Sequence, residues 1–375
     1  MIRSLTTRAE GAAIVNERTG KLRVGIIDDS RTYRSIVRLL LEADGDIEVV
    51  GEAADGAEGI ELIERKRPNL VTMDLDMPRL DGVAAIRRIM AERPTRILVV
   101  TGRPAQHATL LFEALEFGAL DLIVKPSIVD PAGGAAFREM VRTLAKIPVP
   151  DGPPEPDSSP TDLELRAPES RVHRAPVTMI GIVGSTGGPR ATVAVLKQLG
   201  AGFSLPIAVV QHMPEGAEEG YARYLASASA LPVEVVREPV EPRPGRVWLA
   251  PAGAHLVCRP GRLEPAKEPT GERCPSANVL FRSMAEVHGE GAVAIILSGS
   301  KLDGIAGMRE VHARGGLTVV ENDVSALQNV GPRQAIADGV AVRALSAPLI
   351  GAMLFSLGHP QDDLSTIPPA PTSEP

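Results

Sequence analysis

Two stretches of the chain alternate short apolar runs with segments of helical periodicity, and this alternation constrains the fold more than any other feature. The apolar runs have the length and bounding residues typical of buried strands, and the segments between them repeat apolar residues at helical spacing. Alternating strands and helices of this length predict a parallel sheet covered on both faces. The predicted fold class is therefore α/β, with two doubly wound parallel-sheet domains.

The first stretch predicts strands at residues 22–27, 47–50, 70–73, 97–100 and 120–124, with helices at 33–41, 57–65, 83–91 and 108–117. The second predicts main strands at residues 177–183, 206–210, 292–297 and 317–320, with helices at 191–199, 218–230, 279–287 and 307–313. Shorter strands at 233–237, 246–250 and 255–258 are typical of a hairpin region.

Composition marks the boundaries of the two domains. Residues 1–20 show no periodicity and are predicted to be a flexible arm. Residues 146–176 are rich in proline, acidic residues and serine, which predicts a semi-extended linker. Residues 359–375 have a similar composition and are predicted to be a disordered tail. The folded units are then expected at 21–145 and 177–358.

Bulk properties exclude several classes of protein. A net charge of −7 argues against a nucleic-acid partner, and no apolar run is long enough for direct membrane insertion. No signal-peptide pattern follows the first arginines. The two cysteines, Cys258 and Cys274, lack metal-type spacing, so we expect reduced thiols and a cytoplasmic location.

Polar residues in the first domain follow the carboxyl ends of its predicted strands. They are Asp28, Asp29, Asp74, Thr101 and Lys125. This edge is the binding edge of an open α/β sheet. Three carboxylates brought together repel one another unless a cation lies among them, and Mg²⁺ suits such oxygen ligands. Lys125 and Thr101 would supply a cation and a hydroxyl to a phosphoryl group.

With these residues in these positions, residues 22 to about 145 resemble a two-component receiver domain, which has a flavodoxin-like fold. The resemblance implies phosphorylation on Asp74 by a chemotaxis-type histidine kinase. It implies that Asp28, Asp29 and Asp74 hold Mg²⁺ together with the backbone carbonyl of Asp76, and that Thr101 and Lys125 sense the phosphoryl group. Receivers usually carry an aromatic switch residue where this chain has Leu122.

The second domain begins with Gly184-Ser185-Thr186-Gly187-Gly188-Pro189, between a predicted strand and a predicted helix. The glycines let the backbone bend and keep Ser185 uncovered, and Pro189 suits the first turn of a helix. Amides at the helix start, around Thr186 and Gly187, would favour a developing negative charge. A nucleophilic serine and a plain connection remain equally compatible with this stretch alone.

Ser185, His212 and Asp303 each follow a long apolar strand, so they meet at one edge if those strands are neighbours. A serine needs a base, and the base needs a carboxylate, for nucleophilic catalysis. His255 is a rival base. A phosphate-binding loop is disfavoured because Gly-Lys-Ser/Thr is missing, and NAD binding because the next strand ends in Gln211 and His212 rather than an acidic residue.

Most of residues 177–345 resembles the Rossmann-like catalytic domain of the chemotaxis protein-glutamate methylesterases. The matching motifs are Ser185-Thr186-Gly187-Gly188, Gln211-His212-Met213-Pro214, Cys274-Pro275-Ser276 with Val279-Leu280-Phe281, and Asp303-Gly304. The resemblance implies hydrolysis of glutamate methyl esters on methyl-accepting chemotaxis receptors, and glutamine deamidation by the same acyl chemistry, without a cofactor. Ser185 would be the nucleophile, His212 the base and Asp303 its orienting residue, with the unphosphorylated receiver obstructing the site.

The chain departs from the family in three segments. Ser298 to Leu302 replaces Thr-Gly-Met-Gly and a polar residue, Asn329-Val330-Gly331-Pro332 replaces Phe-Gly-Met-Pro, and Asn278 replaces an aspartate. The altered loop at Ser300 to Leu302 leaves a second hypothesis open, a receiver-controlled binding module with a weakened esterase domain. A third is an esterase that acts on a partner outside chemotaxis.

Overall fold

The structure of the protein is a computed structural model that describes residues 20–104, 106–147, 175–267 and 274–358. Nearly all of the predicted arm and linker, and all of the predicted tail, lie outside the described residues. Within those four ranges, no helix is long and apolar enough to cross a membrane.

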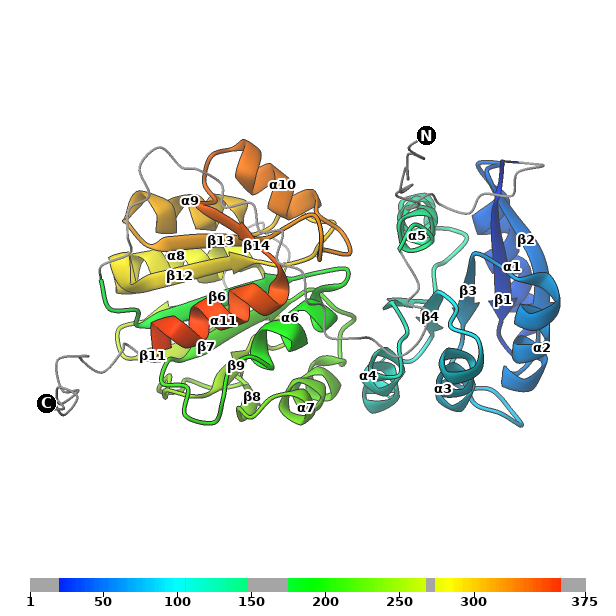
Figure 1. Cartoon of the computed structure of the whole chain (residues 1–375), viewed down its shortest axis with the longest axis horizontal. Coiled ribbons are helices and arrows are strands. Elements are labelled where there is room, and N and C mark those ends of the chain that lie inside the picture. The colour runs from blue at the N-terminus through cyan, green and yellow to red at the C-terminus, as the bar shows by residue number, and fades with distance from the viewer. Residues whose placement is uncertain (1–19, 105, 148–174, 268–273, 359–375) are drawn as a thin grey trace, which may run out of the picture.

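The N-terminal domain is built on a parallel five-stranded sheet with the order β2-β1-β3-β4-β5 (Figure 1). This is the flavodoxin-like order, as predicted. Its strands are β1 (Leu22–Ile27), β2 (Ile47–Ala53), β3 (Leu70–Met73), β4 (Ile97–Thr101) and β5 (Asp121–Val124). Helices α1 (Arg31–Glu42) and α5 (Pro131–Leu144) cover one face, and α2 (Gly56–Lys66), α3 (Gly82–Glu92) and α4 (Ala108–Glu116) cover the other.

Local sequence explains where most of these helices begin. Ser30, Asp55, Asp81 and Asp130 each accept a hydrogen bond from a backbone amide of the first turn, which satisfies a donor that the helix itself leaves free. The apolar pattern did not predict α5, because Gly133 and Gly134 interrupt it. The Asp130 cap and Pro131 in the first turn are the local signals that mark its start.

The C-terminal domain contains a parallel seven-stranded sheet with the order β14-β13-β12-β6-β7-β9-β8. Its strands are β6 (Met179–Gly184), β7 (Ile207–Gln211), β8 (Val233–Val235), β9 (Val247–Leu249), β12 (Ala292–Ile296), β13 (Leu317–Glu321) and β14 (Arg343–Leu345). One face packs on α6 (Gly188–Leu196), α7 (Glu218–Ala228) and α11 (Ala347–Gly358). The other packs on α8 (Ala277–His288), α9 (Ile305–Ala313) and α10 (Val330–Ala337), with a short 3₁₀ turn at Gly289–Gly291.

The structure corrects the predicted hairpin region. The strands predicted at 233–237 and 246–250 are β8 and β9, which pair in parallel inside the main sheet. The hairpin is formed instead by β10 (His255–Arg259) and β11 (Arg262–Ala266), which pair antiparallel. The prediction missed β11, α10, β14 and α11. β14 is only three residues long, α10 has glycine and proline in its first turn, and α11 is apolar on all sides, so none of these three shows a clear period.

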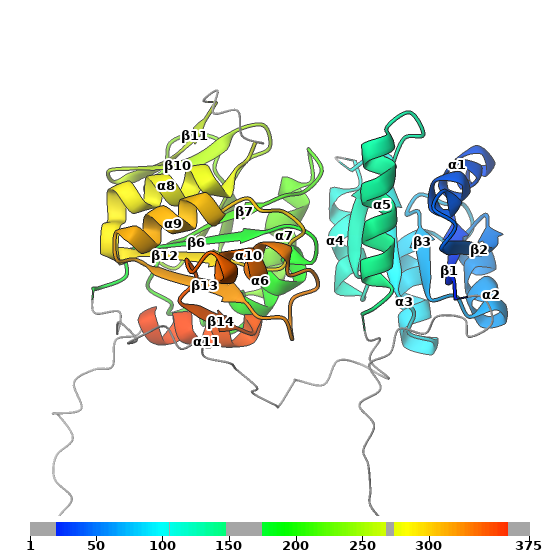
Figure 2. The same ribbon diagram turned by 90° about the horizontal axis from the view of Figure 1, so that it is seen from above.

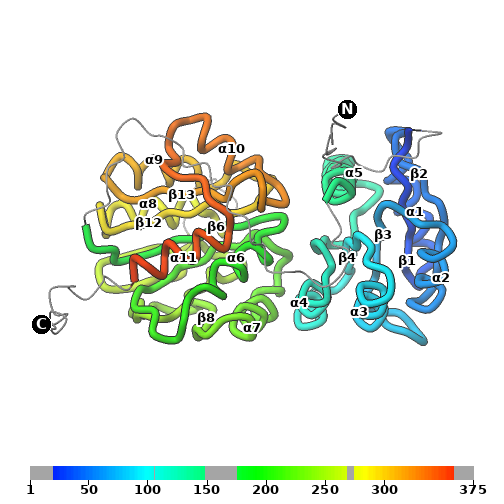
Figure 3. The backbone as a smooth tube through the Cα atoms, in the orientation of Figure 1, coloured from blue at the N-terminus to red at the C-terminus, as the bar shows by residue number. Residues whose placement is uncertain are grey.

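The two domains meet where α4 lies beside α7 (Figures 2 and 3). Phe112 of α4 packs against Tyr221 and Tyr224 of α7, with ring centroids 5.3 and 5.5 Å apart. The helices approach closely because position 220 is glycine, where a Cβ atom would come within 2.2 Å of the Ala108 carbonyl oxygen. Across this contact the apolar cores of the two domains are continuous.

Candidate functional site

The candidate catalytic residues lie at the carboxyl ends of three adjacent strands. In the sheet, β6 lies between β12 and β7. Ser185 directly follows β6, His212 directly follows β7, and Asp303 lies in the segment that leads from β12 to α9. The order of the strands thus meets the condition, set out from the sequence, that these three strands are neighbours in one parallel sheet.

The turn after β6 gives Ser185 its position. The Gly188 amide donates to the Ser185 carbonyl at 2.9 Å, so the chain reverses within one tight turn before α6. Gly187 has φ 77°, and a Cβ atom there would lie 2.5 Å from Leu327 Cβ and 2.7 Å from Ser298 Oγ. Only glycine fits this left-handed and crowded position. From the next strand, Gln211 Nε2 donates to the same Ser185 carbonyl at 2.8 Å.

Asp303 holds His212 through a short hydrogen bond between the His212 Nε2 and Asp303 Oδ2 atoms, 2.9 Å apart. The carboxylate also accepts hydrogen bonds from the Ala277 and Asn278 amides and the Ser276 hydroxyl, at the first turn of α8. Burial by itself would raise the pKa of Asp303, but these hydrogen bonds outweigh it and hold the pKa below its usual value. The group is therefore an anion at neutral pH, fixed against the histidine.

The second ring nitrogen of His212, Nδ1, is buried and has no hydrogen-bond partner among the residues that the structure describes. With Nε2 bonded to Asp303, Nδ1 is the atom left to exchange a proton with a serine.

His255, the rival base, lies at the start of β10, where its Nδ1 accepts from the Ser276 amide at 3.1 Å. Its ring thus binds the N-cap residue of α8.

Two further side chains fix the loops around Ser185, and sequence reasoning did not find them. Ser298 Oγ donates to the Thr186 carbonyl at 2.8 Å, and the Ser298 carbonyl accepts from the Ser185 amide at 3.0 Å. Glu321, at the end of β13, accepts from the Ser298 amide at 2.7 Å and from Ser325 Oγ at 2.8 Å. Burial raises the pKa of Glu321 to about 7. The sequence signal that could have identified Glu321 is its place as a carboxylate at the end of an apolar strand.

The departures from the family pattern keep these contacts. The loop from Ser298 to Leu302 still brings Asp303 to His212. Asn278 accepts from the Gly304 and Gly307 amides at 3.1 and 2.9 Å, and an asparagine carbonyl serves this role as well as a carboxylate. The segment that starts at Asn329 forms the beginning of α10.

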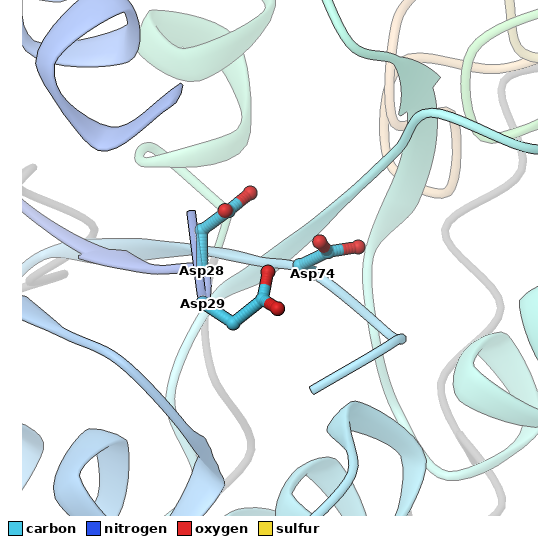
Figure 4. Close-up of side chains that lie close together, drawn as sticks. All are labelled: Asp28, Asp29 and Asp74. Atoms are coloured by element: carbon cyan, nitrogen blue, oxygen red, sulfur yellow. The ribbon is translucent and has the colours of Figure 1, made fainter. Parts of the chain in front are cut away.

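In the N-terminal domain, Asp28, Asp29 and Asp74 converge at the carboxyl ends of β1 and β3 (Figure 4). One oxygen of each carboxylate lies within 4.8 Å of the other two. Lys125 Nζ lies 2.7 Å from both Asp28 Oδ2 and Asp74 Oδ2. Burial raises the pKa of Asp28, and the Asp74 charge adds to this while Lys125 opposes it. Burial works against the charge of Lys125, but its hydrogen bonds to the two carboxylates raise its pKa.

The remaining predicted residues lie around this cluster. Thr101 is fully buried at the end of β4, and its hydroxyl accepts from the Arg103 amide at 3.2 Å. Asp76 turns its side chain outward, 3.9 Å from His107 Nε2. Leu122, at the position of the usual aromatic switch residue, is buried in β5. The ring of Tyr33 lies under Lys125, with the ammonium 4.4 Å from its centroid.

The turn that carries Ser185 contacts the N-terminal domain. Ser185 and Thr186 are only 8% and 7% exposed, and Leu327 beside Gly187 packs against the core of the N-terminal domain. Asp121 of β5 accepts a hydrogen bond from the Gly187 amide at 3.1 Å. No sequence signal marked Asp121 as part of the site.

Comparison with known proteins agrees with this arrangement. The family model of the CheB methylesterase matches residues 180–354, and that of the response regulator receiver domain matches residues 24–131. The protein-glutamate methylesterase/protein-glutamine glutaminase 4 of Myxococcus xanthus is 36% identical over 345 residues, which cover 89% of this chain and 96% of that protein. Its Geobacter sulfurreducens counterpart, number 1, is 34% identical over 364 residues, 92% of this chain and 100% of that protein.

A crystal structure of the Thermotoga maritima CheB methylesterase catalytic domain aligns at 31% identity, covering 48% of this chain and 98% of that chain with a TM-score of 0.46. The length and identity of the matches to whole relatives decide the assignment. The chain belongs to the family of CheB-type protein-glutamate methylesterases/protein-glutamine glutaminases, hydrolases in which a response regulator receiver domain precedes the methylesterase domain.

Proposed function

We propose that this protein hydrolyses glutamate methyl esters on methyl-accepting chemotaxis receptors, giving glutamate and methanol, under the control of receiver phosphorylation. The observation that carries the proposal is the placement of Ser185, His212 and Asp303 at the ends of three adjacent strands, with His212 hydrogen-bonded to Asp303. The names of the relatives supply the substrate. A cytoplasmic location fits a partner kinase and two free thiols.

In the first half of the reaction, Ser185 Oγ attacks the ester carbonyl carbon while its proton passes to His212 Nδ1. Asp303 keeps the ring in the orientation that presents Nδ1 and stabilises the imidazolium. The amides of the Thr186–Gly187 region, at the start of α6, stabilise the negative oxygen of the tetrahedral intermediate. When the intermediate collapses, its bond to the methoxy oxygen breaks, and that oxygen takes the proton from His212 and leaves as methanol.

In the second half, a water molecule gives a proton to His212 and attacks the acyl-serine ester. The bond from the acyl carbon to Ser185 Oγ breaks, the proton returns to Oγ, and a glutamate side chain is released. A receptor glutamine undergoes the same two steps with ammonia as the leaving group, which is the glutaminase activity that the relatives' names record. No step requires a cofactor.

The receiver would bind Mg²⁺ through Asp28, Asp29 and Asp74, with the backbone carbonyl of Asp76. The donor set supports this: three carboxylates converge on one point, all donors are hard oxygens, and in the structure the ammonium of Lys125 lies against two of them. Mg²⁺ bound there would neutralise charge on the phosphoryl donor. Asp74 accepts the phosphoryl group from a chemotaxis-type histidine kinase, and Thr101 and Lys125 respond to it.

In the unphosphorylated state, the receiver would inhibit the esterase by covering it. The low exposure of Ser185 and the packing of Leu327 against the receiver core support this regulation. Phosphorylation of Asp74 would change the hydrogen bonds of Lys125 and so weaken the docked arrangement.

The test is methanol release from a methylated receptor. Ser185→Ala should lower the rate by about three orders of magnitude or more, because a triad acts as a unit. Ser356→Ala, a serine on the exposed side of α11, is the matched control and should leave the rate unchanged. Full activity in Ser185→Ala would refute the nucleophile. Equal labelling of both variants by a serine-directed fluorophosphonate would refute it independently.

A further inference from the structure

Asp121 is a receiver carboxylate that reaches the catalytic loop of the other domain. It is the first residue of β5 and only 5% exposed. Its Oδ2 atom accepts from the Gly187 amide at 3.1 Å, and its Oδ1 atom accepts from the Leu122 amide at 2.8 Å. Both oxygens are therefore used, one inside the receiver and one across the interface.

The Gly187 amide makes its hydrogen bond across the interface, whereas two neighbouring amides of its turn are paired inside the catalytic domain. The Ser185 amide donates to Ser298, the Gly188 amide donates back to Ser185, and Pro189 has no amide hydrogen. Gly187 is also the N-cap of α6, so its amide is among the donors that the helix itself leaves free. An outward-facing amide two residues beyond the nucleophile is thus occupied by a carboxylate from another domain.

The carboxylate receives little help from cations. Among the described residues, no salt bridge involves Asp121, and Arg190 of α6 is the charged side chain that lowers its pKa. Burial outweighs Arg190 and the two amide hydrogen bonds and raises the pKa of Asp121 to about 7. The Gly187 amide is therefore the specific partner that the catalytic domain offers to this group.

We propose that the Gly187 amide is where the enzyme binds the acyl oxygen of its substrate, and that Asp121 occupies it as an internal mimic of the carboxylate product. The inference rests on the proposed esterase function and adds a chemical basis for its inhibition. The reaction leaves a side-chain carboxylate on a protein, and Asp121 presents the same group to the same loop. The receiver thereby fills a substrate position besides covering the site.

Docking of the receiver should then take up a proton. In the undocked state the carboxylate regains water and its ordinary pKa of 3.8, whereas in the docked state the pKa is about 7. Because the docked state binds the proton more tightly, docking is strongest at low pH and weakens as the pH rises toward 7. Linkage between these two values gives a docking constant about tenfold smaller at pH 8 than at pH 6.

The direct test is amide hydrogen exchange at Gly187 in the full-length, unphosphorylated protein, which requires no hydrolysis. Asp121→Ala removes the acceptor and should lower the protection of this amide about ten- to a hundredfold. Arg223→Ala is the matched control. It removes another contact between the domains, the hydrogen bond from Arg223 Nη2 to Thr109 Oγ1 at 2.5 Å, and should leave Gly187 protected. Unchanged protection in Asp121→Ala, or an equal loss in both variants, would overturn the proposal.

A second arm tests product mimicry. In Asp121→Ala, sodium acetate should restore protection at Gly187 and slow fluorophosphonate labelling of Ser185. Sodium chloride at equal ionic strength is the control. In the wild type, acetate should have little effect on either measurement. If acetate has no effect on the variant, the mimicry is wrong. The pH dependence of docking should likewise be present in the wild type and absent in Asp121→Ala. If instead the exchange results hold but no variant releases methanol, the proposed function fails and the contact stands.

Discussion

The aromatic contact between α4 and α7 offers a sharp test of the proposal that the docked receiver inhibits the esterase domain. Phe112 is 2% exposed and lies between its own domain and the rings of Tyr221 and Tyr224. Phe112→Leu keeps an apolar side chain in the receiver core but removes both ring contacts. We expect the docked state to weaken and basal esterase activity to rise.

The size of the effect follows from the two contacts. An aromatic pair at this separation contributes about 0.5–1.5 kcal/mol beyond the area that it buries. Losing two such pairs weakens docking by about 1–3 kcal/mol, which is roughly a five- to 150-fold change in the docking constant. The phosphorylated enzyme should change little, because it is already undocked.

The assay is methanol release from a methylated receptor, with and without a small phosphoryl donor. Phe203→Leu is the matched control, because Phe203 is also buried but packs against Gly358, away from the receiver. Basal activity should rise for Phe112→Leu and not for Phe203→Leu, and the maximal rates should agree. An unchanged basal rate in folded Phe112→Leu would show that this contact does not hold the enzyme inactive.

Three further substitutions test separate parts of the mechanism. Asp303→Asn should lower kcat by about four orders of magnitude with little change in KM, since it removes the anion that holds His212; steady-state kinetics on a methylated receptor measures both. Asp74→Asn should abolish stimulation of the esterase by a phosphoryl donor and keep basal activity. Stimulation equal to that of the wild type would refute control of the esterase through Asp74. Glu321→Gln should stabilise the protein at pH 8 by up to about 3 kcal/mol, because the raised pKa of about 7 means that the folded state loses stability as pH rises above 4.5. Denaturant unfolding should show this gain shrinking towards pH 5, and a gain independent of pH would contradict the cause.

The sequence predicted most of the framework because buried parallel strands leave a plain signal. β6 and β7 are apolar up to their last residues, and β1 and β3 are apolar apart from one residue each. The polar residues that follow these strands lie at the predicted edges of the sheets. The helices that it missed lack such a signal. α5 carries two glycines, and α11 is apolar throughout and has no polar face.

The parts of the site that escaped prediction depend on contacts between distant segments. In the sequence, Asp121 is an ordinary residue at the start of a predicted strand. Its role depends on the contact between the receiver and Gly187, which only the structure shows. Glu321 and Ser298 come within hydrogen-bond distance only because β13 and β12 lie side by side in the sheet. No local pattern encodes these pairings, whereas Ser185 and His212 directly follow apolar strands and Asp303 lies in the segment after a third.

The most direct test of the account is methanol release from a methylated chemoreceptor by the full-length protein, measured before and after addition of a phosphoryl donor with Mg²⁺. Wild type, Ser185→Ala and Asp74→Asn are compared. The account predicts slow release by wild type that the donor accelerates, no release by Ser185→Ala, and release without acceleration by Asp74→Asn. Release that persists in Ser185→Ala, or no release by folded wild type with the donor present, would contradict it.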